Sequence, residues 1–303
     1  MLSIVVLGTA AGGGVPQWNC GCANCAAARD DHRQLRSTQA SIAVSADREH
    51  WFLINASPDL RQQMTDTPCL HPKPGATRSS PIAGVLLTNG EVDAVAGLLS
   101  LREGSRFGLF AHERVLRILD ANSIFNVLVA ALVPRIAIEV DAPFEPALPD
   151  GSPSGLEITA FAAPGKTALF LEDADNDELG DTLGLVIRDR ADGRRLVFLA
   201  ACAAVTPEVR THLEGAAMVF FDGTLWRDDE MIALGLGKKT GQRMGHISME
   251  EAITALDGLG IGAAKFFLHI NNSNPALREN SPERRQLEKH GWRIPADGME
   301  ITL

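Results

Sequence analysis

Short apolar runs, most of them ending in polar residues, recur along the chain and predict more strands than helices. Residues 2–8 predict a buried strand. Residues 39–60 predict a hairpin, because two apolar runs there are separated by a polar joint. Further strands are expected within residues 82–93, 107–120, 134–163, 168–202, 216–224, 263–275 and 284–303.

Helical patterns alternate with these strands. Residues 94–104 predict a short helix that ends at Gly104, and residues 248–259 predict another, with Ser248 as N-cap and Glu251 completing a capping box. Residues 168–202 are read as strand, acidic loop, strand, Asp-Gly turn and strand. Strands joined by short loops in some places and by helices in others favour an α/β (α+β) architecture, an αββα sandwich in a single domain over residues 1–303.

The composition supports a globular protein and argues against two classes of partner. The chain has 303 residues, of which 45% are hydrophobic, and a formal net charge of −10 without a long Lys/Arg run. Nucleic acid is therefore a poor partner, and no apolar run is long enough to cross a bilayer. Because the apolar start of the chain lacks a basic region typical of a signal peptide, we expect a cytoplasmic protein with no membrane partner.

Three of the five cysteines lie in one short loop, at about residues 17–28. Cys20, Cys22 and Cys25 have a C-x-C-x2-C spacing that lets thiolates wrap one soft cation, such as Zn(II), Cu(I) or an iron–sulfur cluster. The alternative is three reduced thiols that bind no metal. We favour the metal site, because a cluster this tight seldom occurs without a use.

A structural zinc site needs a fourth ligand from elsewhere in the chain. By chemistry alone, the candidates are His32, His269, Asn272 and a water molecule. Cys69 and Cys202 show no such pattern and are expected to be buried apolar thiols.

Polar residues also follow several apolar runs directly. Asn89, Glu91 and Asp93 occupy alternate positions after one strand, and on an extended backbone they would point to one side. In isolation this segment is better explained as a solvated acidic turn. The same pattern recurs where Asp222 and His269 end two other predicted strands, and where His246 precedes a helix, so we expect a common site.

Six segments taken together resemble a known family. They are VVLGTAAGGGVPQWNCGCANC, NASPDLRQQ, LTNGEVDAVAGLL, FFDGTLW, MGHIS and HINNSNP. Their combination is similar to the pyrroloquinoline quinone (PQQ) biosynthesis protein B family, within the metallo-β-lactamase superfamily, over the whole chain. The resemblance implies the αββα metallo-β-lactamase-like fold.

The resemblance also implies how the site departs from the superfamily. The metal motif His-x-His-x-Asp-His aligns with residues 89–94, where Asn89 and Glu91 replace the two leading histidines and Ala94 replaces the last one. The usual metal-bridging aspartate aligns with residues 200–202, which contain none. His269 matches the last metal histidine.

Asp222 and His246 match positions that support the ligands or touch substrate. We therefore expect His246, His269 and Asp222 to be catalytic and one ion to be held by side chains from a mixed set. The expected ligands are Asn89, Glu91, Asp93 and His269, with His246 beside them. Mixed oxygen and nitrogen donors favour Fe(II) or Mn(II), with Zn(II) as the other choice.

The activity that the resemblance implies is iron- and dioxygen-dependent hydroxylation of the tyrosine ring in a Glu–Tyr precursor made from a small peptide. Other PQQ-pathway proteins are possible partners. It also implies a structural Zn(II) at the cysteine loop with Asn272 as the fourth ligand. The alternatives are a non-catalytic carrier involved in transport of PQQ or its precursor, which the eroded motif favours, and a metal-dependent hydrolase, which the missing histidines disfavour.

Overall fold

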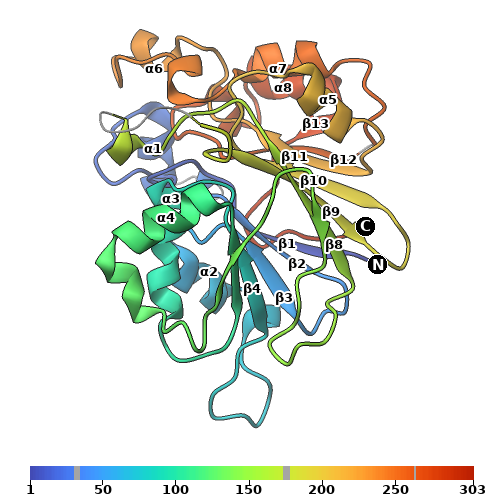
Figure 1. Cartoon of the computed structure of the whole chain (residues 1–303). Coiled ribbons are helices and arrows are strands. Elements are labelled where there is room, and N and C mark those ends of the chain that lie inside the picture. Colours follow the sequence, from blue (N-terminus) through green and yellow to red (C-terminus); the bar gives the residue numbers. More distant parts are fainter. Residues whose placement is uncertain (31–34, 173–177, 263) are drawn as a thin grey trace.

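Two seven-stranded sheets lie against each other at the centre of the molecule (Figure 1). The computed structural model describes residues 1–30, 35–172, 178–262 and 264–303. The first sheet has the order β14 (Glu300–Thr302), β1 (Ser3–Gly8), β2 (Ser41–Ser45), β3 (Trp51–Ile54), β4 (Ile82–Leu86), β5 (Gly108–Ala111) and β6 (Arg135–Ala137). The second has the order β13 (Trp292–Arg293), β12 (Ala264–Leu268), β11 (Met218–Asp222), β10 (Arg195–Leu199), β9 (Leu183–Asp189), β8 (Leu156–Ala162) and β7 (Pro143–Phe144).

Both sheets mix parallel and antiparallel pairing. In the first, β3 to β6 are parallel, and in the second, β10 to β13 are parallel, while the remaining pairs are antiparallel. Parallel neighbours bring their carboxyl ends to the same edge of a sheet. Asp222 at the end of β11 and His269 after β12 are thereby placed at one edge of the second sheet. Asp93, after β4 of the first sheet, reaches the same edge through its contact with His269.

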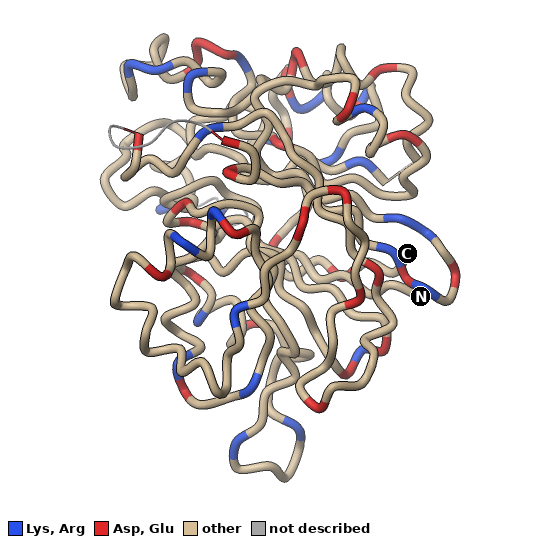
Figure 2. The backbone as a smooth tube through the Cα atoms, viewed as in Figure 1, with Lys and Arg blue, Asp and Glu red and all other residues tan. Residues whose placement is uncertain are grey.

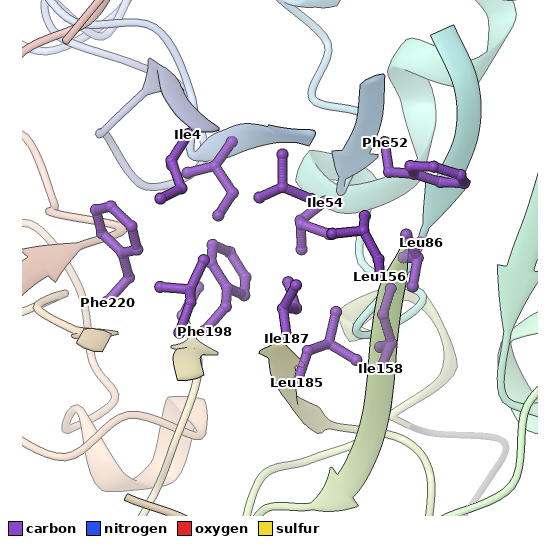
Figure 3. Packing of buried hydrophobic residues seen from close by; sticks show 14 of the residues in the cluster. Ile4, Phe52, Ile54, Leu86, Leu156, Ile158, Leu185, Ile187, Phe198 and Phe220 are labelled. Carbon is purple, nitrogen blue, oxygen red and sulfur yellow. The ribbon is translucent and has the colours of Figure 1, made fainter. Parts of the chain in front are cut away.

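The space between the sheets is filled by side chains of both. Figure 3 shows Ile4 and Ile54 of the first sheet facing Ile187, Phe198 and Phe220 of the second. These residues are at most 1% exposed. Because burying one such side chain contributes about 1.5–3 kcal/mol, this layer is a main source of the stability of the fold.

Helices cover the outer face of each sheet, which confirms the predicted αββα sandwich (Figure 1). The first sheet is covered by α2 (Leu60–Asp66), α3 (Val92–Val95), α4 (Glu113–Ala121) and the 3-10 helices η3 (Ala96–Leu101) and η4 (Ser123–Val127). The second is covered by α5 (Pro207–Leu213), α7 (Met249–Leu256) and α8 (Pro282–Lys289). The predicted capping box of α7 is present, with Ser248 and Glu251 in their expected roles. The other helices are α1 (Ala23–Arg29), α6 (Glu230–Ala233), η2 (Pro68–Leu70), η5 (Leu169–Leu171), η6 (Gln242–Met244) and η7 (Pro275–Leu277).

Two local predictions are confirmed and two are corrected. The hairpin within residues 39–60 is β2 and β3, and the Asp-Gly turn lies between β9 and β10, with Gly193 at φ 73°. The helix predicted over 94–104 begins earlier, as α3, and continues as the 3-10 helix η3. The strand predicted at the start of 168–202 is the 3-10 helix η5, because Leu169 and Phe170 are exposed and have no sheet to bury them.

Gly97 holds the segment after Asp93 tightly against the loop that follows β3. Its amide donates to the carbonyl of Ala56 at 2.8 Å. A Cβ at this position would lie 2.8 Å from the carbonyl carbon of Ala56 and even closer to the carbonyl oxygen of Ser57. The segment that carries Asp93 is therefore fixed by backbone contacts.

Replacing Gly97 by alanine is expected to destabilise the protein by about 1–3 kcal/mol, because backbone atoms must move to admit the methyl group. Urea unfolding of the two proteins measures the difference. An unchanged midpoint would contradict this close packing.

Charged residues are spread over the surface. Figure 2 shows short blue segments separated by red and tan ones along the backbone. Among the residues that the structure describes, no helix combines the length and apolar character needed to span a membrane.

Candidate metal centre

A cavity of about 800 Å³ opens where the carboxyl ends of parallel strands from both sheets come together. His246 and His269 line it, together with Asn89, Glu91 and Asp93. Ala200 and Ala201 line it as well, at the positions where the superfamily's bridging aspartate was expected. These five predicted residues therefore share one cavity, although not all of them touch one another, whereas Asp222 is buried and does not line it.

Asp222 ends β11, is completely buried and fixes the orientation of His246. One carboxylate oxygen, Oδ2, accepts from the amide of Cys202 at 2.9 Å and lies 2.8 Å from Nδ1 of His246. The other oxygen, Oδ1, accepts from the amide and the hydroxyl of Thr224, at 3.0 and 2.8 Å. When Nδ1 of His246 donates to Asp222, its Nε2 keeps the lone pair that can bind a metal or a proton.

His269 follows β12 in a left-handed backbone conformation, with φ 58°. Its ring stacks on that of His246 with 5.1 Å between centroids. The hydroxyl of Thr224 lies 2.9 Å from Nδ1 of His269 and 3.1 Å from Nδ1 of His246, so one side chain links both rings. Thr224 is a site residue that no sequence motif marks, and its only signal is a hydroxyl two residues after the aspartate that ends a buried strand.

Asp93 reaches His269 from the other sheet. Its Oδ2 lies 2.9 Å from Nε2 of His269. Burial alone would lower the pKa of His269, but the hydrogen bond and charge of Asp93 outweigh it and raise that pKa above its usual value. Burial alone would raise the pKa of Asp93, but His269 holds it below its usual value.

These side chains suit a divalent cation. Ligand atoms of Asp222, His246 and His269 lie within 4.8 Å of one another, and Asp93 contacts the last of them. Imidazole nitrogen and carboxylate oxygen are donors that Fe(II), Mn(II) and Zn(II) accept. Because Asp222 is engaged in orienting His246, the remaining donors are the two imidazoles and the Asp93 carboxylate, which fit one ion and lack the histidines typical of a two-zinc site.

Glu91 and Asn89 lie along the same cavity but outside this cluster. The Glu91 carboxylate accepts from Nζ of Lys166 and from the amide of Leu169, both at 3.1 Å. Asn89 accepts from the amide of Glu91 at 3.0 Å. The expectation of an extended backbone holds only as far as Glu91, because α3 begins at Val92 and Asp93 lies within it, although all three side chains line the cavity. As metal ligands, Asn89 and Glu91 remain predictions.

The three clustered cysteines converge as the spacing indicates. The Sγ atoms of Cys20, Cys22 and Cys25 lie within 4.8 Å of one another. The side-chain amide of Asn272 lies among them, with its Nδ2 at 3.1 Å from Cys20, 3.5 Å from Cys22 and 3.3 Å from Cys25. Asn272 is adjacent to the thiols, but it faces them with Nδ2, which donates hydrogen bonds and cannot bind zinc, so Asn272 as the fourth ligand remains a prediction. Of the other candidates, His269 is engaged by Asp93, and His32 lies outside the described residues.

Electrostatics at this cluster favour a cation. Burial, with the neighbouring thiols, raises the pKa of Cys25 to about 11. Burial would also raise the pKa of Cys22, but hydrogen bonds from the Cys25 backbone and from nearby side chains hold it below its usual value. If all three thiols lost their protons, the thiolates would repel one another at this distance, and a bound soft cation would remove that repulsion.

The cysteine loop is fastened to the loop that carries His269. The side chain of Asn24 donates to the carbonyls of Asn272 and Asn274, at 3.0 and 2.9 Å. Asn274 in turn donates to the carbonyl of Gly223 at 3.1 Å.

The two cysteines outside the cluster differ in burial. Cys202 is buried, as expected for an apolar thiol, and burial raises its pKa to about 12. Cys69 was expected to be buried as well but is only half-buried.

Comparison with known proteins places the chain in a family. Residues 50–270 match the family model of the beta-lactamase superfamily domain. Coenzyme PQQ synthesis protein B from Rhodopseudomonas palustris is 64% identical over 310 residues, covering 100% of this chain and 100% of that protein. The chain belongs to the coenzyme PQQ synthesis protein B family. The member from Bradyrhizobium diazoefficiens is 60% identical, again over 100% of both chains.

Solved structures agree with this membership. The zinc-bound PqqB of Methylobacterium extorquens, a member of the family, matches with a TM-score of 0.93 and 46% identity, covering 99% of this chain and 100% of that one. A diphosphatase of the PhnP family has a TM-score of 0.69 at 18% identity, covering 100% and 98% of the two chains, and so shares the fold. The coenzyme PQQ synthesis protein B family therefore has the metallo-β-lactamase fold described here.

Proposed function

We propose that the chain acts in PQQ biosynthesis as an Fe(II)- and dioxygen-dependent hydroxylase of the tyrosine ring in a Glu–Tyr precursor. The observation that carries the proposal is one cluster of two imidazoles and two carboxylates, His246, His269, Asp93 and Asp222, beside a cavity of about 800 Å³. A cavity of this size falls within the range of small-molecule sites. The names of the family members support the pathway.

The ligand chemistry supports iron over a pair of zinc ions. Asn89 and Ala94 stand where the superfamily's hydrolases have histidines, and Ala200 and Ala201 stand where a bridging aspartate was expected. Donors of mixed type with open positions are typical of Fe(II) oxygenases. When bound, Fe(II) supplies the redox chemistry that dioxygen activation requires.

The protein's own side chains then have separate tasks. Asp222 holds the proton on Nδ1 of His246, so that Nε2 is available as a ligand. Nε2 of His269 shares a proton with Oδ2 of Asp93, and that proton leaves when both atoms become ligands. Thr224 fixes the two rings relative to each other, because its hydroxyl contacts Nδ1 of both.

A second part of the proposal concerns the cysteine loop. Cys20, Cys22 and Cys25 would hold a structural Zn(II), with the carboxamide of Asn272 turned so that Oδ1, in place of the Nδ2 that now donates to the thiols, takes the fourth position. The contacts between Asn24 and the loop after β12 support a structural role, because they fasten the cysteine loop to the segment that carries His269. A cytoplasmic location and partnership with other PQQ-pathway proteins follow from the biosynthetic role and belong to the same proposal.

Single-turnover oxygenation tests the function. Protein purified without oxygen is loaded with Fe(II), mixed with the Glu–Tyr precursor and exposed to ¹⁸O₂. We expect the precursor to gain oxygen atoms that carry the label. The Zn(II)-loaded protein is the control, because zinc has no redox chemistry.

Two other outcomes would replace the proposal. Tight binding of PQQ or the precursor with unchanged mass would identify a carrier. Turnover of a phosphodiester or lactone by the Zn(II) form would identify a hydrolase.

A further inference from the structure

Two lysines face the cavity from different parts of the chain. Lys166 lies in the segment after β8, and Lys239 lies between α6 and η6. Among the described residues, no other lysine or arginine lines this cavity. In a chain with net charge −10, two cations brought together beside the candidate metal centre call for an explanation.

The ammonium groups of Lys166 and Lys239 both form ion pairs with the carboxylate of Glu172. Nζ of Lys166 lies 2.7 Å from Oε1 of Glu172, and Nζ of Lys239 lies 2.5 Å from Oε2 of the same residue. Each carboxylate oxygen thus has its own lysine. The hydrogen bonds to Lys166 and Lys239 lower the pKa of Glu172 to about 2. The spacing of the lysines is therefore that of a carboxylate-binding clamp, which the protein's own Glu172 fills.

The clamp lies next to an apolar wall of the cavity. Leu169 and Phe170 line the cavity and are 62% and 49% exposed, which is unusual for large apolar side chains. An aromatic ring packed there would cover them, and carboxylates on that ring would lie close to Lys166. This pairing of an apolar wall with two cations matches an aromatic polycarboxylate.

We propose that Lys166 and Lys239 form the recognition site for a carboxylate of the bound substrate or product, which takes the place of Glu172 between them. This rests on the proposed function only for the identity of the ligand, the Glu–Tyr precursor or PQQ, both of which carry several carboxylates. The exchange conserves charge, because one carboxylate replaces another. Glu91 remains paired with Lys166 at 3.1 Å and keeps that lysine pointed into the cavity.

Affinity for PQQ, measured by calorimetry without iron or dioxygen, tests the clamp. Lys239→Gln is expected to raise Kd about tenfold, because it removes one charged hydrogen bond to the ligand. Lys239→Arg should recover most of the affinity. Lys238→Gln is the matched control, since Lys238 is the exposed neighbour and does not line the cavity.

Glu172→Gln separates recognition from a merely structural ion pair. It removes the internal competitor, so Kd for PQQ should fall. The methyl ester of PQQ should bind the native protein weakly and show no difference between native protein and Lys239→Gln. The proposal is overturned if Glu172→Gln weakens binding as much as Lys239→Gln does, or if the ester is as sensitive to Lys239→Gln as the acid.

The same measurements distinguish the clamp from the catalytic proposal. If Lys239→Gln weakens PQQ binding but no labelled oxygen enters the precursor, the clamp is supported and the hydroxylase is not. If oxygen is incorporated and Lys239→Gln keeps the native Kd for PQQ and the native KM for the precursor, the hydroxylase is supported and the clamp is rejected.

Discussion

Replacement of His269 is expected to reduce bound iron and oxygen incorporation by more than about 100-fold, since even the loss of an outer hydrogen-bond partner costs about 10–100-fold. His269 is the side chain through which Asp93 of one sheet reaches the residues that follow the strands of the other. Without its imidazole, Asp93 loses its partner and Thr224 loses one of the two rings that it links. Iron analysis of the purified variant and the labelled-oxygen assay measure the two losses.

The backbone conformation at His269 determines which substitution removes the imidazole with the least loss of stability. Its φ of 58° is left-handed, a conformation that costs most residues about 1–2 kcal/mol and that asparagine tolerates better than alanine. His269→Asn should therefore keep the native melting temperature more closely than His269→Ala, while both lose iron. His290→Ala, at the exposed end of α8, is the matched histidine control. Oxygen incorporation at the native rate in His269→Asn would show that the site is misplaced.

The site residues that the sequence could predict are those that belong to a local pattern, such as a polar residue directly after an apolar run. Asp222 and His269 were found because each follows a long apolar run, and the parallel strands β11 and β12 carry both to the same edge. The alternation that was used to align Asn89, Glu91 and Asp93 stops at Glu91, because it holds only for extended backbone and a helix begins directly after that residue. The way in which the two sheets pack against each other brings Asp93 to His269. This packing is a tertiary property that no local sequence pattern encodes.

The residues that were missed share a different feature. Lys166, Glu172 and Lys239 are single charged residues in loops, and each resembles an ordinary surface charge in the sequence. Their common role depends on a tertiary contact, because Lys239 lies 2.5 Å from Glu172 although 67 residues separate them in the sequence, while Lys166 lies 2.7 Å from the same carboxylate. The cysteine loop is the opposite case, because its three thiols lie within six residues and chain connectivity alone keeps them close.

Replacement of Cys22 by serine is expected to remove bound zinc and to lower the free energy of unfolding by an amount on the order of several kcal/mol, because metal binding of this kind contributes directly to folding. Zinc content by elemental analysis and thermal melting measure the two effects. The matched control is Cys69→Ser, which changes a thiol outside the cluster and should leave zinc content unchanged.

The loss at Cys22 should also reach the candidate catalytic centre. Asn272, whose amide lies among the thiols, is three residues from His269, and Asn24 ties the cysteine loop to the carbonyls on both sides of Ser273. Once the cysteine loop is released, His269 loses part of what holds its strained backbone, so iron occupancy should fall in Cys22→Ser although no iron ligand has changed. If Cys22→Ser keeps full zinc and native melting, the cysteine cluster is not a structural metal site. If it loses zinc but keeps native iron occupancy, the two centres are independent, and the contacts between their loops have no energetic role.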